Sequence, residues 1–354
     1  MAIVDDRITA DQAYGLACQG TALLWRGDYQ NARQLLAAMG RRADRHPRKA
    51  GKPAATSAPA DAFHRHRQAQ AQRARTLGML LVQLDGEYRI DLHRAPVVRD
   101  ACAEAWGAGD GPSVVSLREL LGLIGAHEWR AKGIPIPALG GRIHPHYGVF
   151  TPIRSEYVDL VASAPLPEAL STAGVAFDIG TGTGVLAALL ARRGIARIVA
   201  TDQDPRALAC ARDNVGRLGL AGQVEVVQAD LFPEGRAALV VCNPPWVPAR
   251  PSSPIERGIY DPDSGMLRGF LAGLAGHLLP GGEGWLVLSD LAEHLGLRSR
   301  AELLGLVSQA GLKVVARLDA KPRHPKASDA SDPLHAARAA EATSLWRLAA
   351  NSRA

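Results

Sequence analysis

Two turns in the second half of this 354-residue sequence carry residue types that suit ligand chemistry. The first is Asp178-Ile-Gly180-Thr-Gly182-Thr-Gly184, which follows the apolar run VAFDI and precedes the helix-like run VLAALLARR. Glycines in such a turn let the backbone bend tightly and approach a ligand closely. The N-terminus of the following helix offers free N–H groups to an anion. These residues predict a site for a nucleotide-like molecule.

The second turn is Asn243-Pro244-Pro245-Trp246, which ends the apolar run ALVVC. Its two prolines fix the backbone and remove two N–H donors, which is more than an ordinary turn requires. The Asn243 side-chain oxygen and the Pro244 carbonyl can each accept one N–H of a planar NH2 group and turn its lone pair toward an electrophile. Trp246 is expected to stack on that group. The alternative is a rigid loop with a core tryptophan.

Three acidic residues follow strand-like segments: Asp178 lies in VAFDI, Asp202 follows RIVAT, and Asp230 follows QVEVVQA. The glycine turn also satisfies the GxGxxG/A pattern with Asp202 about 20 residues further on, so a dinucleotide is one candidate cofactor. Acids placed to meet an amino group, a ribose and an adenine amine fit S-adenosylmethionine better, because it has no pyrophosphate. Structural roles are the alternatives: a turn cap, an arginine partner and a surface acid. Asp204-Pro205 is expected to start a helix.

The elements that must position these turns alternate along the chain from about Ala173. Segments VAFDI, VLAALLARR, RIVAT, PRALACARDNVGRL, QVEVVQ and ALVVC read as strand, helix, strand, helix, strand and strand. This order predicts a parallel, doubly wound sheet, which binds ligands at the carboxyl ends of its strands. Beyond it we expect a helix at 263–279, a strand WLVLSD, a helix at 300–310 and strands KVVARLD and TSLWRL.

The first 142 residues are expected to form three segments. Residues 1–40 are predicted to be a helical segment, with a helix at 11–39, and the basic, Pro/Ala-rich residues 41–62 a flexible linker. Residues 63–142 are predicted to form a small α/β or mostly helical module that helps to recognise the substrate. It should contain helices at 63–79 and 114–129 and an alternating segment at 80–92. Residues 143–354 form the main domain.

Composition gives weaker indications. The net charge of +6 is compatible with an acidic partner such as RNA. No segment has the length and apolarity of a membrane span, and the N-terminus lacks a signal-peptide pattern, so we expect a cytoplasmic protein without a membrane partner. The four scattered cysteines predict small core residues without disulfides or zinc. His144-x-His146 lacks a third ligand, so no metal is expected.

The ordered motifs DIGTGTG, TDQDPRAL, QAD and NPPW resemble those of class I S-adenosylmethionine-dependent methyltransferases with an (N/D/S)PP(Y/F/W) signature. The segment HPHYGVFTPIRSEYVDLV resembles the one before the glycine turn in the HemK-like methyltransferase small domain group, which includes release-factor and ribosomal-protein glutamine methyltransferases. The resemblance covers residues 143 to the C-terminus. It implies an α/β, Rossmann-like fold with a seven-stranded sheet, helices on both faces, and S-adenosyl-L-methionine as cofactor.

The resemblance also implies the roles of individual residues. The catalytic set is Asn243, Pro244, Pro245 and Trp246. Either Arg154 or Glu156 joins Phe150 and Pro152 over the cofactor. The implied cofactor-binding set is Phe150, Pro152, Asp178, Gly180, Thr181, Gly182, Gly184, Asp202, Gln203, Asp230, Leu231 and Asn243.

Our hypothesis is an N-methyltransferase that acts on a planar NH2 nitrogen of a macromolecule, first of all a glutamine side chain of a translation-related protein. Trp246 stands where those relatives carry tyrosine, and they lack the basic linker. RNA or DNA methylation at adenine N6 or guanine N2 is therefore an alternative. Its candidate phosphate contacts, or a merely solvated loop, are Lys321, Arg323, His324 and Lys326. An NAD-dependent enzyme and a catalytically silent binding module are further alternatives.

Overall fold

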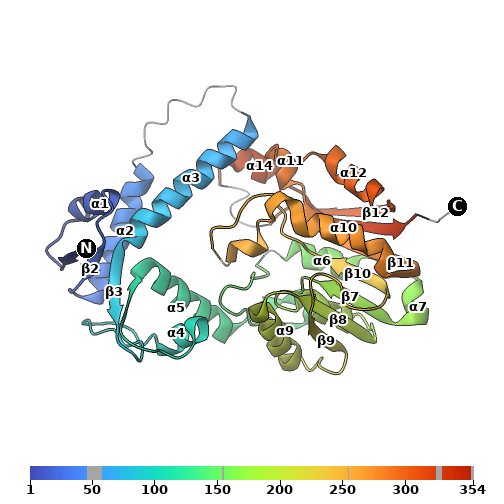
Figure 1. Ribbon diagram of the computed structural model, residues 1–354, viewed down its shortest axis with the longest axis horizontal. Helices are drawn as coiled ribbons and strands as arrows, with labels where there is room; N and C mark the ends of the chain where they lie inside the picture. Colours follow the sequence, from blue (N-terminus) through green and yellow to red (C-terminus); the bar gives the residue numbers. More distant parts are fainter. Residues whose placement is uncertain (46–57, 154, 254, 324–328, 352–354) are drawn as a thin grey trace. The chain divides into compact units, whose positions relative to one another are not determined.

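The computed structural model describes residues 1–45, 58–153, 155–253, 255–323 and 329–351 (Figure 1). The chain separates into two compact units, Met1–Glu128 and Trp129–Ala354. The central part of the expected flexible linker, residues 46–57, lies outside the described residues. The ends of that linker are helical, because α2 (Tyr29–Arg45) continues into it and α3 (Pro59–Gly78) begins before its expected end.

The N-terminal unit contains a four-stranded sheet in the order β1-β2-β3-β4. The strands are β1 (Ala2–Val4), β2 (Leu23–Trp25), β3 (Leu80–Leu84) and β4 (Ser113–Ser116), and the helices besides α2 and α3 are α1 (Ala10–Cys18), α4 (Arg99–Trp106) and the start of α5 (Leu117–Lys132). The expectation of a single helix at 11–39 is wrong, because a strand separates two helices in this range. Gly20, with φ +84°, follows α1, and the next residues enter β2 with Leu23 and Trp25 buried. Since β2 pairs with β3, residues 1–45 and 59–128 build one sheet-containing unit.

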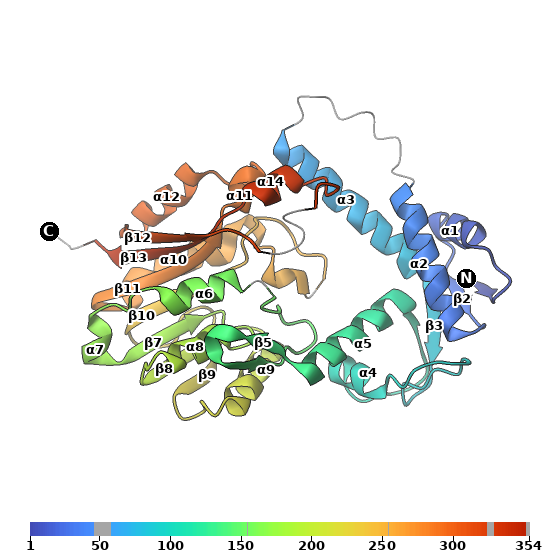
Figure 2. The same cartoon turned by 180° about the vertical axis from the view of Figure 1, so that it is seen from behind.

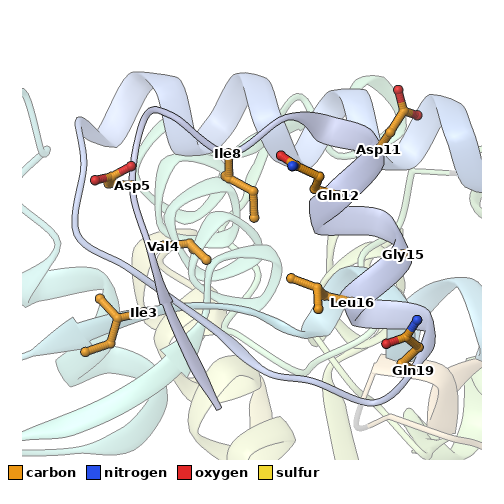
Figure 3. A pocket seen from close by; sticks show the side chains of 9 residues that line it. All are labelled: Ile3, Val4, Asp5, Ile8, Asp11, Gln12, Gly15, Leu16 and Gln19. Carbon is orange, nitrogen blue, oxygen red and sulfur yellow. The ribbon is translucent and has the colours of Figure 1, made fainter.

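A hollow lies against β1 and α1 in this unit (Figure 3). It is lined by Ile3, Val4, Asp5, Ile8, Asp11, Gln12, Gly15, Leu16 and Gln19. None of these residues belongs to the site expected from the sequence. We assign no chemistry to it.

The C-terminal unit is built on a seven-stranded sheet in the order β12-β13-β11-β10-β7-β8-β9 (Figures 1 and 2). Its strands are β7 (Val175–Ile179), β8 (Arg197–Asp202), β9 (Val224–Gln228), β10 (Ala237–Cys242), β11 (Leu278–Ser289), β12 (Leu312–Ala320) and β13 (Thr343–Ala350). The pairs from β11 through β9 are parallel, and β13 is antiparallel to both of its neighbours. The expected seven-stranded α/β sheet is confirmed.

Alternating side chains of the central strands bury two apolar faces, as the period of two requires. Ala176 of β7 and Leu239 of β10 pack in one cluster with α6 (Glu156–Ser163), α8 (Val185–Arg192) and α9 (Pro205–Arg217). Phe177 and Val240 pack in another with α10 (Gly265–His277) and α12 (Arg300–Gln309). Helices therefore cover both faces of the sheet (Figures 1 and 2).

The C-terminal unit begins before the expected boundary at Ile143. A hairpin of β5 (Ile134–Ile136) and β6 (Gly141–Ile143), joined by η1 (Pro137–Leu139), buries Ile136 and Leu139 in the cluster that contains α8. Apolar packing therefore ties this hairpin to the main sheet. The remaining short helices are α7 (Ala169–Ala173), η2 (Ile255–Gly258), η3 (Pro262–Ser264), α11 (Leu291–His294) and α14 (His335–Ala340).

Several local expectations are confirmed. Asp204 is the N-cap of α9, accepts the Arg206 N–H at 3.0 Å and precedes Pro205 in the first helical turn. Cys102, Cys210 and Cys242 are buried free thiols, but Cys18 is exposed and is not a core residue. Within the described part of the chain, none of the helices combines the length and apolarity needed to span a membrane.

Candidate cofactor and substrate site

The expected site residues lie at or just after the carboxyl ends of four neighbouring strands. Asp178 lies in β7, Asp202 ends β8, Asp230 follows β9, and Asn243 follows β10 directly. These strands are adjacent and parallel (Figure 1). The residues therefore lie at one end of the sheet. This is the end at which open α/β sheets bind ligands.

The turn after β7 adopts the tight conformation expected of its glycines. Gly180, Gly182 and Gly184 have φ values of +70°, +55° and +80°. A Cβ on Gly184 would lie 3.2 Å from Ala211 Cα in α9, whereas a Cβ on Gly182 would meet nothing within 4 Å. Gly184 therefore permits close packing of two helices, and Gly182 faces open space above the strand ends.

Asp178 holds this turn against the start of α8. Its side chain is 1% exposed, and Oδ2 accepts the Thr181 hydroxyl at 2.6 Å and the Ala187 N–H at 3.0 Å. Burial raises the pKa of the Asp178 carboxyl to about 6. The observed contacts are those of a turn-holding acid.

Asp202 joins two turns through its two oxygens. Oδ2 accepts the Gly182 N–H at 3.0 Å, and Oδ1 accepts the Asp204 N–H at 3.0 Å. Burial also raises the pKa of the Asp202 carboxyl. The neighbouring Thr201 hydroxyl donates to the Leu231 carbonyl at 2.5 Å, and Leu231 has the left-handed φ of +69°. Gln203 and Asp230 are exposed at the same edge.

The turn after β10 is held by a hydrogen bond that the sequence did not reveal. The Trp246 indole Nε1–H donates to Asn243 Oδ1 at 2.8 Å. Pro244 is buried, Pro245 is half-buried, and the Trp246 ring packs against both apolar clusters of the sheet. The expected stacking of Trp246 on a substrate remains a prediction, since these contacts do not test it.

Sequence reasoning missed a second layer behind this turn. Arg298, 7% exposed, donates to the Trp246 carbonyl at 3.4 Å and to the Ser264 hydroxyl at 3.3 Å. Asp261 is buried and accepts the N–H groups of Met266 and Leu267 at the start of α10. Arg298 lies between two helices in a chain with 41 lysines and arginines, so nothing in the sequence singled it out.

The segment before the glycine turn contains a buried carboxylate with one unpaired oxygen. Glu156, in the first turn of α6, is 1% exposed, and its Oε1 makes no hydrogen bond. Helix α6 packs against α8 and against β12 and β13. Pro152 is buried, and Phe150 lies against the backbone of Gly258. Arg154 lies outside the described residues.

Both histidines and one residue of the basic loop, Arg323, have structural partners. His144 Nδ1 lies 2.6 Å from the Arg130 carbonyl, and His146 Nε2 lies 3.2 Å from Asp213 Oδ2. In the described ranges, no group of three or more His, Cys, Asp or Glu side chains could hold a metal ion. Arg323 pairs with Asp159 at 3.2 Å. Lys321 is exposed, and His324 and Lys326 lie outside the described residues.

Residues 141–300 match the family model of the methyltransferase small domain. A ribosomal protein L11 methyltransferase of Pelotomaculum thermopropionicum is 53% identical over 72 residues, which are 20% of this chain and 23% of that protein. A release factor glutamine methyltransferase of Cereibacter sphaeroides is 34% identical over 188 residues, which are 48% of this chain and 63% of that protein. The match spans less than two thirds of either relative.

Among solved structures, a ribosomal protein L11 methylase of Lactobacillus delbrueckii subsp. bulgaricus is 14% identical, with a TM-score of 0.37 over 56% of this chain and 80% of that one. Over residues 141–300 the chain is thus similar to S-adenosylmethionine-dependent methyltransferases of the small-domain family.

The cofactor of this family is S-adenosylmethionine, and the residues at the strand ends fit its parts. The unpaired Oε1 of the buried Glu156 carboxylate suits the α-ammonium group, since burying a polar atom without a hydrogen-bond partner is costly. Asp202 lies where a ribose hydroxyl can donate, and the open side of Gly182 leaves room for the amino-acid part. The expected cofactor is thus consistent with the donors and acceptors present.

We expect the affinity for S-adenosylhomocysteine to rise about tenfold between pH 5 and pH 7, because the ionised Asp178 holds the turn that receives the cofactor. Its pKa is raised from 3.8 to about 6. The stability that this group contributes to the free protein is therefore present below pH 3.8 and is lost as the pH rises through about 6. Calorimetric titration between pH 5 and pH 7 tests the affinity, urea unfolding of the free protein tests the stability, and Asp178→Asn should remove the slope. A flat affinity profile in the unmodified protein would contradict the assignment.

Proposed function

We propose that this protein transfers a methyl group from S-adenosylmethionine to the planar NH2 nitrogen of a glutamine side chain in a translation-related protein. One observation carries the proposal. The Asn243 carboxamide directly follows β10, on the same sheet edge as the glycine turn, and its oxygen is oriented by the Trp246 N–H at 2.8 Å. An oriented acceptor beside a cofactor turn is what activation of an amide nitrogen requires.

The chemistry follows from the electronic state of an amide nitrogen. Its lone pair is delocalised into the carbonyl and points toward no electrophile. When bound, the cofactor supplies an electrophilic methyl group on a positively charged sulfur. We assign to Asn243 Oδ1 and the Pro244 carbonyl the two N–H groups of the target, so that its lone pair turns toward that methyl group. The new N–C bond replaces the S–C bond, S-adenosylhomocysteine leaves, and the nitrogen releases one proton to water.

Glu156 is assigned to the α-ammonium group of the cofactor, Asp202 to the ribose and Asp230 to the adenine amine. Asp178 holds the glycine turn in shape through Thr181 and Ala187. The N-terminal unit, Met1–Glu128, is assigned to recognition of the macromolecule. Of the α/β and mostly helical alternatives expected at 63–142, its sheet fits the first, but the unit also includes the N-terminal strands.

A protein substrate is favoured over RNA. The two relatives named above are a release factor glutamine methyltransferase and a ribosomal protein L11 methyltransferase. The basic loop offers less support for RNA than expected, since Arg323 already pairs with Asp159. The alternative of an NAD-dependent reaction is tested most directly by measuring which of the two cofactors binds.

The test has two stages on the same sample. Calorimetry with S-adenosylhomocysteine and with NAD should show binding of the first alone. Tritium transfer from labelled S-adenosylmethionine is then measured with three acceptors: a release factor of Cereibacter sphaeroides, ribosomal protein L11 and total transfer RNA. Label on a release-factor glutamine, located by tandem mass spectrometry, supports the proposal. Label in RNA or on another residue type overturns the glutamine assignment, and binding of NAD alone overturns the methyl transfer.

A further inference from the structure

The indole of Trp246 fixes which way the Asn243 carboxamide faces. An indole N–H can only donate, so the atom that faces it at 2.8 Å must be the amide oxygen and not the NH2 group. Oδ1 has two lone pairs, and the indole uses one of them. The other lone pair is left for one further N–H donor.

Trp246 is in turn held at two places. Its ring packs against the apolar clusters on both faces of the sheet. Its backbone carbonyl accepts the Arg298 Nη2–H at 3.4 Å, and Arg298 Nη1 donates to Ser264 at 3.3 Å. Arg298 is only 7% exposed, and its Nε has no hydrogen-bond partner among the described residues. A buried arginine of this kind is costly, and its described hydrogen bonds go to the Asn-Pro-Pro-Trp turn and to the residue before α10.

We infer that Trp246 is a positioning residue: its indole N–H orients the Asn243 oxygen toward the target nitrogen, and Arg298 holds Trp246 in place. This inference rests on the proposed function for its catalytic meaning. It differs from the stacking role expected from the sequence, because the part of the ring that matters is the N–H and not the aromatic face.

The contact itself can be tested without any substrate. The full chain contains six tryptophans, so 15N-labelled tryptophan gives at most six indole N–H signals, and Trp246→Phe identifies that of Trp246. We expect Asn243→Ala to move this signal upfield and to speed its exchange with water several-fold. Arg298→Met should shift the same signal. Arg300→Met is the matched control, because Arg300 lies 5.2 Å from the Trp346 ring, so it should shift the Trp346 signal instead.

The catalytic meaning is tested with the release factor as acceptor. Trp246→Phe keeps an aromatic face but loses the donor, so kcat should fall about fivefold with little change in KM, as expected for one neutral hydrogen bond of about 1 kcal/mol. In the Asn243→Ala background the same substitution should have almost no further effect on kcat, because the residue it positions is gone.

The outcomes separate the two levels of the proposal. If the Trp246 signal ignores Asn243→Ala, the positioning role is overturned whatever the substrate is. If Trp246→Phe leaves kcat unchanged while Trp246→Leu raises KM, Trp246 is a stacking surface and the inference fails although methyl transfer stands. If the release factor takes no label, the glutamine assignment fails, and the indole signals still decide whether Trp246 orients Asn243.

Discussion

Asn243→Ala is expected to lower kcat for methyl transfer by about a hundred- to a thousandfold, the usual effect of losing one preorganised polar group at a reacting centre. The substitution removes the oxygen that Trp246 orients at 2.8 Å and leaves the glycine turn and its acids intact. The dissociation constant of S-adenosylhomocysteine should therefore change far less than kcat. A loss confined to kcat marks an interaction made in the transition state.

Two further variants sharpen this result. Asn243→Asp keeps an oxygen acceptor for the indole, but it adds a charge and removes the NH2 group. Its activity should therefore stay below that of the unmodified protein. Asn351→Ala removes an exposed asparagine side chain at the end of β13 and serves as the matched control with unchanged activity. Retention of kcat in Asn243→Ala would refute amide activation at this turn.

The residues that the sequence placed correctly at the sheet edge were found through local rules. A glycine turn between an apolar strand and a helix, and an N-cap Asp204 before Pro205, depend on neighbours a few positions apart. Asn243 was also found by a local rule, because it lies between a buried strand and two prolines. Such features need no knowledge of distant parts of the chain.

The errors arose where distant segments decide the local structure. Strand β2 has three residues, and its conformation depends on pairing with β3, whose Leu80 lies opposite Leu23. Its flanking sequence has helical patterning on both sides, so a helix at 11–39 was the local solution. The hairpin before Ile143 joined the main unit for the same kind of reason, since its burial depends on contact with α8.

The second layer of the site shows a related limit. The spacing of Asn243 and Trp246 permits a hydrogen bond between them, but spacing alone does not orient the indole. Arg298 contacts the Trp246 carbonyl across 52 residues of chain. Only the packing of α10 and α12 on the same face of the sheet brings these residues together.

Glu156→Gln should raise the stability of the free protein and lower its affinity for the cofactor product, a combination that we do not expect from a surface substitution. The free protein should become more stable by about 1 kcal/mol or more, because the substitution replaces a buried carboxylate that has no partner for Oε1 with a neutral amide. The affinity for S-adenosylhomocysteine should fall by about 10- to 100-fold, because a charge-assisted contact to the α-ammonium group is lost. Urea unfolding of the free protein measures the first effect, and calorimetry the second.

A second ligand shows whether the lost contact is to the amino-acid part. 5′-Methylthioadenosine shares the adenosine portion but lacks the ammonium group, so its affinity should be the same in both proteins. Asp159→Asn on the same helix removes an acid that is paired with Arg323 at the surface, and should change neither affinity.

Equal weakening of the binding of both ligands in Glu156→Gln would mean that the carboxylate supports the fold of the site and does not bind the ammonium group. A less stable free protein would mean that Glu156 is already satisfied, and the assignment of this carboxylate to the cofactor would be wrong. Stabilisation together with selective loss of the amino-acid ligand has one simple physical explanation: the chain keeps a buried carboxylate with an unpaired oxygen because the cofactor supplies the missing partner.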